Sequence, residues 1–357
     1  MPPKLTEGEL YIMGDRDFRT GEPGPYVKIG IVRNEKESSA RQSQHQTGNP
    51  REIVILATAK SPMVESLETH LHHHFAERWV HGEWFDMDEA FVHNEVMPLV
   101  ASLIAEQEAD RVMFEAQESL KGKVSSGNSR APSPQEQALH AAFCDAKRLA
   151  DRLEAEQTVL KQHILDAMAG AGGVQGVVTV QVKTNAGTFD KAGLLAAHPT
   201  ETAPYMVTKP AKTEVKGSLT PKNTPTLKSE NEALHAASSA ATAAVKAITV
   251  AQGQSKEGTR TTSLMTLHAT YLAGMGPLFK ANLAVDRLKA HLAHALGDDD
   301  EIEGVVSWKR VEKTTPESVD LDKTSFAKAH PDLVAAFTGP ETQSTAFKMS
   351  ECRPYPI

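Results

Sequence analysis

An internal repeat in the C-terminal two-thirds of the chain restricts the fold most strongly. Residues 138–168 align without a gap to residues 266–296, and the likeness continues as a Gly-Val-Val triplet, an Asp-Lys pair and a His-Pro pair in each copy. Each copy predicts a long amphipathic helix, a strand or hairpin around Gly-Val-Val, a short helix that ends at His-Pro, and a final strand. Asp190 and Asp322 precede the short helices and are expected to be their N-caps. The repeat therefore predicts one α+β module present twice.

Length and composition exclude several classes of protein. The chain has 357 residues, enough for two or three domains. Its longest apolar run, residues 97–105, is far shorter than the roughly 20 residues that span a bilayer. The N-terminal residues have no apolar core of the secretory type, and two cysteines exclude a disulfide framework. We expect a soluble, cytoplasmic protein without a membrane partner.

Two polar stretches rich in Gly, Ser and Pro predict the domain boundaries. The expected order is a domain at 1–120, a linker at 121–134, repeat 1 at 135–218, a linker with an Ala/Ser-rich segment at 219–260, and repeat 2 at 261–351. Before the first linker, apolar alternation predicts strands at 8–13, 25–32 and 51–59, and helical spacing predicts helices at 36–46, 63–77 and 88–118. This part of the chain is α+β.

The N-terminal domain contains the side chains that phosphodiester hydrolysis uses. Tyr11 lies on the first predicted strand and Lys28 on the second. Arg41 and His45 are four residues apart and share one face of a predicted helix, and Glu68 lies on a later helix. A carboxylate can hold a hard cation, and an arginine can stabilise the charge that develops on a phosphate. For each residue taken alone an alternative remains open. Tyr11 could be a core aromatic, Arg41 and His45 could lie on an exposed helix face, and Glu68 could be a solvated acid.

Five short motifs in this region resemble a known family. GELYIM, VKIG, the run from Arg41 to Pro50 that ends in QTGNP, the segment from Glu68 to Phe75, and Gly-Glu-Trp-Phe at 82–85 follow in that order. Together they resemble the GIY-YIG nuclease superfamily, in its phage-type branch, over about residues 8–90. The resemblance implies a small three-stranded antiparallel sheet flanked by helices, and a Mg²⁺- or Mn²⁺-dependent endonuclease acting on DNA.

The resemblance also implies roles for individual residues. Tyr11 matches the tyrosine of the first motif, Arg41 the arginine that contacts phosphate, His45 the histidine one turn later, and Glu68 the single glutamate that binds the metal. Gly30 matches the glycine of the second motif. Lys28 stands where the family usually has a tyrosine, with Tyr26 two residues earlier on the same face of the strand. Whether Tyr11 acts as general base alone or with help from Lys28 stays open.

The net charge of −8 argues against a general nucleic-acid binder, but the charge is unevenly distributed. Residues 1–60 contain nine Lys/Arg and eight Asp/Glu, whereas residues 61–110 contain one and eleven. A local basic face includes Lys28, Arg33, Lys36, Arg41 and Arg51. We expect Tyr26, Arg33 and Arg51 to contact the substrate. Because phosphate contacts are few, we expect DNA binding to be weak and sensitive to salt.

Other interpretations remain beside the nuclease. A non-catalytic adaptor could use the same fold to bind DNA or protein, and Lys28 favours this alternative. Histidines at 70, 72, 73, 74 and 81 suggest a zinc site. The absence of a nearby cysteine in the sequence argues against it. The repeats faintly resemble the accessory tail of YqaJ-type phage recombination exonucleases, which implies a partner in DNA processing and a phage-related or anti-phage setting. A further hypothesis is an oligomer formed through the long helices.

Overall fold

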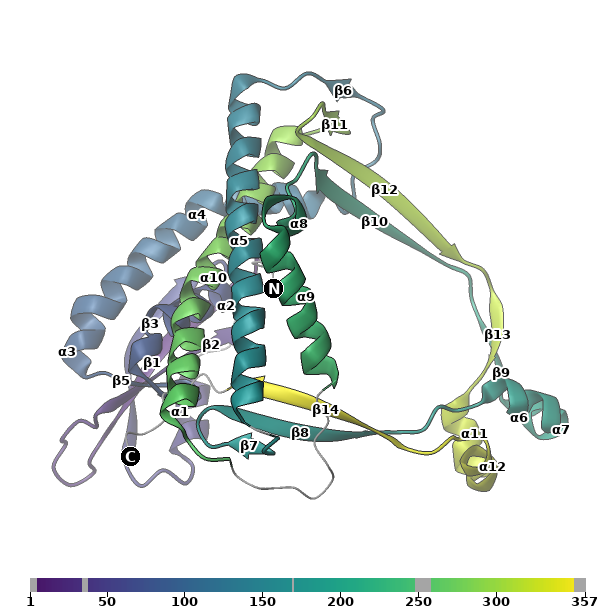
Figure 1. Ribbon diagram of the computed structural model, residues 1–357, viewed down its shortest axis with the longest axis horizontal. Helices are drawn as coiled ribbons and strands as arrows, with labels where there is room; N and C mark the ends of the chain where they lie inside the picture. The colour runs from purple at the N-terminus through teal and green to yellow at the C-terminus, as the bar shows by residue number, and fades with distance from the viewer. Residues whose placement is uncertain (1–4, 34–37, 169, 248–257, 350–357) are drawn as a thin grey trace.

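A computed structural model describes residues 5–33, 38–168, 170–247 and 258–349 of the chain. Lys36, which the sequence places on the basic face, lies outside the described residues. The architecture is α+β, as predicted: an N-terminal sheet flanked by helices leads into a larger assembly of long helices and β-ribbons (Figure 1). Among the described residues, no helix combines the length and the apolar character that crossing a membrane requires.

The N-terminal sheet has five antiparallel strands in the order β3-β1-β2-β5-β4. Their bounds are β1 (Gly8–Arg16), β2 (Tyr26–Arg33), β3 (Glu52–Ser61), β4 (Trp79–His81) and β5 (Trp84–Asp86). The three predicted strands, β1 to β3, are neighbours in it, with β1 between β2 and the edge strand β3. The short hairpin β4-β5 was not predicted, because three-residue strands carry too little alternation to be recognised. Its turn uses Gly82 with a φ of 55°, which favours glycine.

Helices cover both faces of this sheet. Alternate residues of β1 and β2 point to opposite faces, and two separate apolar clusters result. Helix α1 (Ser38–Gln46) lies against one face, where Tyr11 and Met13 are buried. The other face carries the larger core under α2 (Val64–His74) and the segment formed by α3 (Glu89–Phe91) and α4 (Met97–Ser119), with Leu10, Ile12, Leu67 and Leu71 fully buried. The helices expected at 36–46, 63–77 and 88–118 are therefore present, with shifted ends.

The long helices of the two repeats pack against each other within one chain. Helix α5 (Pro134–Ala167) runs antiparallel to α10 (Thr262–Leu296), and its first turns share a core with the last turns of α10. Helices α8 (Leu227–Glu230) and α9 (Glu232–Ala247) occupy part of the segment expected to be a linker. That segment is helical because it is rich in alanine, is capped by the Asn231 side chain, and can pack on α5.

The repeats exchange strands. Strand β8 (Val178–Asn185) of repeat 1 pairs antiparallel with β14 (Thr342–Met349) of repeat 2, and β10 (Lys212–Pro221) pairs with β12 (Val306–Thr315) in the same way. Strands β9 (Met206–Lys209) and β13 (Ser318–Leu321) join the two copies once more. Both repeats run from a long helix through a short and a long strand to two short helices and a final long strand, but β9 follows the short helices whereas β13 precedes them. Asp190 and Asp322 cap α6 (Lys191–Ala197) and α11 (Lys323–Ala329) as expected. Neither copy is an independent sheet.

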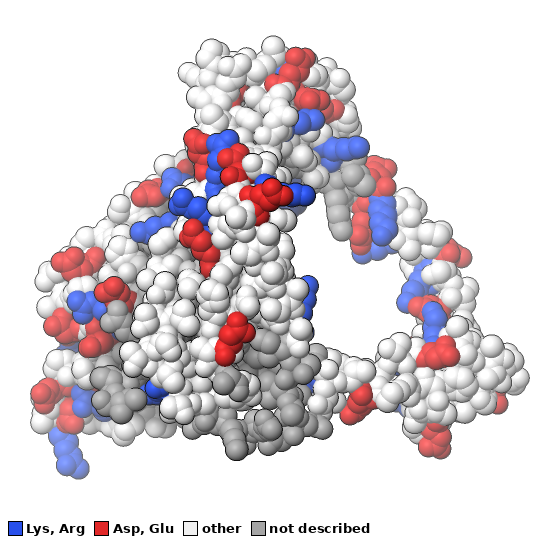
Figure 2. All heavy atoms as spheres, viewed as in Figure 1, with Lys and Arg blue, Asp and Glu red and all other residues white. Residues whose placement is uncertain are grey.

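The exchange closes a triangular frame (Figure 1). The helices form one side, the two β-ribbons form the others, and α6, α7 (Pro199–Thr202), α11 and α12 (Pro331–Ala336) meet at the far corner around Leu194, Leu321 and Phe326. Short strands lie at the other two corners, namely β7 (Gly173–Val174), and β6 (Ser129–Arg130) with β11 (Glu301–Ile302). The space-filling view shows an opening through the frame, with basic and acidic side chains interspersed along the ribbons (Figure 2).

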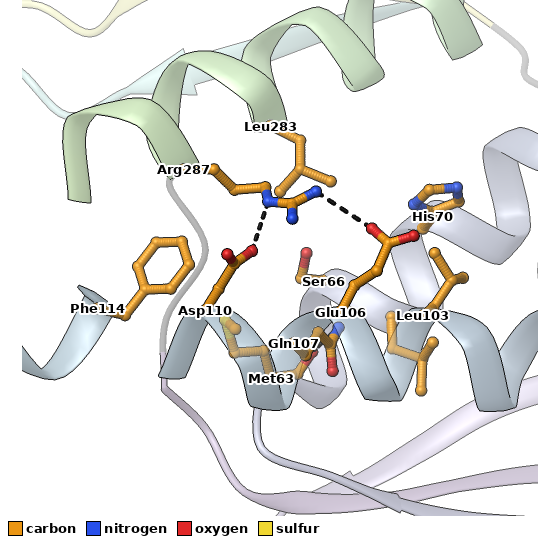
Figure 3. Close-up of a pocket in the computed structure, with 11 residues that line it drawn as sticks. Met63, Ser66, His70, Leu103, Glu106, Gln107, Asp110, Phe114, Leu283 and Arg287 are labelled. Carbon is orange, nitrogen blue, oxygen red and sulfur yellow. Dashed lines mark hydrogen bonds and ion pairs between the residues drawn. The ribbon is translucent and has the colours of Figure 1, made fainter. Parts of the chain in front are cut away.

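The N-terminal domain joins the frame through α10. Arg287 of α10 forms ion pairs with Asp110 and, at 3.1 Å, with Glu106 of α4 (Figure 3). His291 Nε2 lies 3.3 Å from the other oxygen of Asp110, whose side chain is only 8% exposed. Nearby, Met63, Phe114 and Ala290 form a small apolar cluster across the same junction. The junction thus combines a buried acid, its two basic partners and an apolar contact.

Candidate functional site

The site begins at the closest approach between β1 and β2. Tyr11 pairs with Gly30 in the antiparallel register, and its side chain crosses the Gly30 Cα on the face covered by α1. A Cβ at residue 30 would lie 2.5 Å from the Tyr11 hydroxyl oxygen and 2.6 Å from its Cζ. Only glycine leaves room for the ring there. Gly30 therefore places the Tyr11 hydroxyl above the second strand.

Lys28 lies two residues before Gly30 and faces the same side of the sheet. Its side chain is 8% exposed and forms an ion pair with Glu83, which stands between β4 and β5. The main chain also joins these segments, because the Ile29 N–H donates to the Glu83 carbonyl at 3.0 Å. The ammonium group of Lys28 is therefore held in the site by a carboxylate from the neighbouring hairpin.

Helix α1 brings two more functional groups to this face. The Gln42 side chain donates to the Ile53 carbonyl at 2.7 Å, which fixes the helix on β3. Among the described residues Arg41 donates to the neutral amide of Gln44, at 2.9 Å, and its positive charge partly opposes the rise in the pKa of Tyr11 that burial causes. Partial burial, and then the positive charge of Lys28, lower the pKa of His45. These effects place Arg41 and His45 close to Tyr11 and Lys28.

Glu68 reaches the site from α2. Strand β5 pairs only with residues Tyr26 to Lys28, so the rest of the β2 edge is open to this helix. His72 occupies part of that edge, with Nε2 3.1 Å from the Ile29 carbonyl oxygen. Burial, and then the negative charge of Glu83, raise the pKa of Glu68 to about 7. Glu83 thus stands close enough to Glu68 to disfavour the charged form of Glu68.

Tyr11 keeps its proton in this environment. Burial is the main cause that raises its pKa to about 12, and the negative charges of Glu83 and Glu68 add to it. Arg41 acts in the opposite direction. The Tyr11 hydroxyl is therefore a hydrogen-bond donor at neutral pH rather than a ready base.

The structure brings five of the predicted residues together: Tyr11, Lys28, Arg41, His45 and Glu68. Tyr26 shares their face of the sheet and is 39% exposed. Arg33 and Arg51, expected to contact the substrate, are instead engaged within the chain. Arg33 forms an ion pair with Glu65, and Arg51 forms ion pairs with Asp15 and Asp17. The assignment of substrate contacts to these two arginines remains a prediction.

Glu83 is the residue that sequence reasoning missed. It contacts Lys28 and affects the pKa values of Tyr11, His45 and Glu68. The signal was available, because Glu83 belongs to the Gly-Glu-Trp-Phe segment. That segment was used only as one of the five motifs of the family pattern, without a role for its glutamate.

The donor set around Glu68 suits a hard cation. Within the part of the chain that the structure describes, no three His, Cys, Asp or Glu side chains gather into a full metal cage. A site with one carboxylate is the kind that Mg²⁺ uses, because Mg²⁺ retains several water ligands. The raised pKa of Glu68 fits as well, since a cation would offset the repulsion from Glu83.

The histidines on α2 have other surroundings. His72 packs against Trp79 and Phe85, and its ring nitrogen meets the Ile29 carbonyl. His70 and His73 lie on the opposite side, 5.6 and 5.1 Å from the ring of Phe279 on α10. Their pKa values are lowered, mainly by burial. These rings pack against aromatic side chains, which neutral imidazoles do readily.

Comparison with known proteins gives information on the N-terminal domain. Residues 9–99 match the T5orf172 domain, a phage-associated domain related to nuclease-like domains. The match covers the whole N-terminal sheet, α1 and α2, and therefore every candidate residue described above. No curated protein and no solved structure matches the chain. The match indicates a nuclease-like or DNA-binding function for this domain.

Proposed function

We propose that the N-terminal domain is a metal-dependent DNA endonuclease of the GIY-YIG type, and that the duplicated frame binds DNA or a protein partner and so places the nuclease. The observation that carries this proposal is the convergence of five side chains from β1, β2, α1 and α2 on one part of the sheet, namely Tyr11, Lys28, Arg41, His45 and Glu68. The T5orf172 match supports the same class of function.

The proposed roles follow from the surroundings of each side chain. Arg41 has no carboxylate partner among the described residues, so its guanidinium can bind a phosphate oxygen and stabilise charge in the transition state. Tyr11 holds its proton and orients the attacking water through its hydroxyl. Lys28, held by Glu83, supplies positive charge beside that water. His45 stands beside Arg41 on the same helix face and contacts the phosphate.

Glu68 would hold the metal, and water would complete the coordination shell. When bound, Mg²⁺ or Mn²⁺ supplies positive charge that offsets the charge of the phosphate oxygens and of the leaving alkoxide. In this proposal Glu68 fixes the position of the metal, Arg41 orients the phosphate, and Tyr11 orients the attacking water.

Cleavage of supercoiled plasmid tests the proposal. Wild-type protein with Mg²⁺ or Mn²⁺ is expected to nick or cut the plasmid. Glu68→Gln and Arg41→Ala are each expected to reduce the rate by at least about 100-fold, the range found when a charge-stabilising group is removed. Glu95→Gln is the matched control, because it removes an exposed acid of the same domain away from the site. Thermal unfolding of each variant shows that the fold is retained.

An adaptor without catalysis is the second candidate. The observation that favours it is the ion pair between Lys28 and Glu83, which occupies the position of the second tyrosine in the family pattern. DNA binding by wild type, without cleavage under any metal, would support the adaptor and reject the nuclease. Equal cleavage by wild type, Glu68→Gln and Arg41→Ala would place the active site elsewhere.

A further inference from the structure

The turn between β1 and β2 presents an aromatic ring to solvent. Phe18 is 62% exposed. The turn that carries it is well braced: the Asp17 carboxylate accepts from the Arg19 N–H at 2.8 Å and from the Thr20 N–H at 3.0 Å. Gly21, with a φ of 73°, donates to the Asp17 carbonyl at 2.8 Å. An exposed phenylalanine on a braced turn contributes little to the core.

This turn is fastened to the face of the sheet that holds the candidate site. Arg51 binds the Asp15 and Asp17 carboxylates and donates to the Glu22 carbonyl at 2.9 Å. Asp15 lies an even number of residues from Tyr11 along β1, so both point to the face covered by α1. Arg51 therefore acts as a clamp that holds the turn toward the side of Tyr11.

Two arginines in the described part of the N-terminal domain are available to bind an anion. The described part of the N-terminal domain has seven arginines. Four form ion pairs with carboxylates, and a fifth, Arg78, lies over the ring of Phe91 at 4.1 Å. The remaining two are Arg41, in the candidate site, and Arg19, beside Phe18. The Arg19 side chain is exposed and its guanidinium has no partner among the described residues.

We propose that Phe18 and Arg19 form a DNA-contacting tip, in which Arg19 pairs with a backbone phosphate and Phe18 inserts at a base step. This inference rests on the proposed function. Five residues of β1 lead from Tyr11 to the end of the strand at Arg16, about 17 Å at 3.3 Å per residue, and Phe18 follows two residues later in the turn, at most about 23 Å from Tyr11. A duplex that lies along β1 therefore meets the tip on the order of five to seven base pairs from the cut, at 3.4 Å per pair. Apolar side chains that enter a duplex in this way unstack a step and bend the DNA.

Binding measurements separate the two contacts. In the Glu68→Gln background, we would titrate a fluorescent 30-base-pair duplex at several salt concentrations. Phe18→Ala is expected to weaken binding about 5- to 100-fold, the range for one base–aromatic contact, with an unchanged salt slope. Arg19→Ala is expected to reduce the magnitude of the salt slope by about 0.9, the value for one phosphate, and Arg19→Lys to restore it. Val124→Ala, a 70% exposed apolar residue outside the domain, is the matched control.

A base analogue locates the contact. 2-Aminopurine placed in turn five, six and seven base pairs from the mapped cut is expected to brighten at one of these positions with Phe18 present and to stay dim with Phe18→Ala. If wild type cleaves but Phe18→Ala and Arg19→Ala bind like Val124→Ala, the tip is wrong and the nuclease proposal stands. If wild type binds no DNA, both proposals fail. If Phe18→Ala changes the salt slope instead of the base signal, the assignment of the two contacts is wrong.

Discussion

Gly30 is the single residue on which the geometry of the candidate site most depends. A methyl group there would meet the Tyr11 ring at 2.5–2.9 Å, and the ring has no alternative space because it is 3% exposed. We expect Gly30→Ala to lower stability by about 1–3 kcal/mol, the usual cost of overpacking, and to reduce cleavage by displacing the Tyr11 hydroxyl. Thermal unfolding and plasmid cleavage measure the two effects.

Gly122→Ala is the control, because its added methyl would find no atom closer than 3.9 Å. Tyr11→Phe separates the hydroxyl from the packing, since it keeps the ring and removes only the oxygen. A Gly30→Ala protein with wild-type cleavage and stability would show that Tyr11 is not held as described.

The sequence pointed to the side chains of the candidate site but not to the groups that contact them. Tyr11, Arg41 and Glu68 belong to motifs with fixed spacing, so their identity can be read from the chain. Glu83 acts through the Lys28 ammonium across the β2–β5 pairing, and that pairing depends on a short hairpin with almost no local signal. The partners of Arg33 and Arg51 likewise lie far along the chain or in a turn, and only the folded chain brings them together.

Among the elements, the start of α5 offers a prediction about acid stability. Ser133 and Glu136 form a capping box, and Glu136 also binds Arg130 at 2.6 Å. The Arg130 guanidinium lowers the pKa of Glu136 to about 2. Because the folded state holds the carboxylate, its contribution to stability is complete above about pH 5 and disappears as the pH falls toward 2.

We therefore expect Glu136→Gln to unfold about 1–2 °C below wild type at pH 7, which corresponds to about 1 kcal/mol in a chain of 357 residues. The difference in unfolding temperature between the two proteins should narrow steadily as the pH falls from 5 to 2. Thermal unfolding by circular dichroism at several pH values measures it. A gap that stays constant down to pH 2 would mean that the Arg130 ion pair does not stabilise the fold.

Helix α9 shows why one element was predicted as a linker. Residues 217–231 are rich in Pro, Thr, Lys and Ser, and the Ala/Ser-rich stretch that follows has, up to residue 247, only Leu234 and Val245 as large apolar residues, too few for a helical period. The helix forms because small side chains allow a close approach to α5, where Ala241 is fully buried. That gain depends on a surface made by another segment, and local pattern does not contain it.

At the scale of the whole molecule, Arg287 links the candidate nuclease domain to the frame. Arg287→Ala leaves Asp110 buried with His291 as its remaining partner. We expect a loss of about 1–3 kcal/mol at the junction, less than for a fully buried pair because Arg287 is partly exposed. Calorimetry should then resolve separate unfolding of the domain and the frame.

Arg111→Ala is the control, since Arg111 forms exposed ion pairs with Glu7 and Glu115, and exposed pairs contribute little to stability. The double change Asp110→Leu with Arg287→Met should recover stability, because it replaces the ion pair with apolar packing. An Arg287→Ala protein that unfolds like wild type would show that the ion pairs of Arg287 do not stabilise the junction.

The exchanged strands predict that the two repeats hold together without a covalent link. A protease site inserted between residues 247 and 258 would divide the chain between repeat 1 and repeat 2. Because β8 pairs with β14 and β10 with β12, the two fragments should co-elute in gel filtration after cleavage and separate only in denaturant. Elution as two separate species under native conditions would show that each repeat folds alone.

The same exchange of strands determines when the ribbon strands can pair during synthesis. Val178 of β8 has its partner at Met349, so the first ribbon strand must wait for nearly the entire chain to leave the ribosome. At about 5–20 residues per second, that wait is on the order of 10–30 s. During it, β8 and β10 are unpaired edges of the kind that aggregate. Their threonines and lysines, seen in VTVQVKTN and KTEVKGSLTP, suit strands that must remain in water before their partners exist.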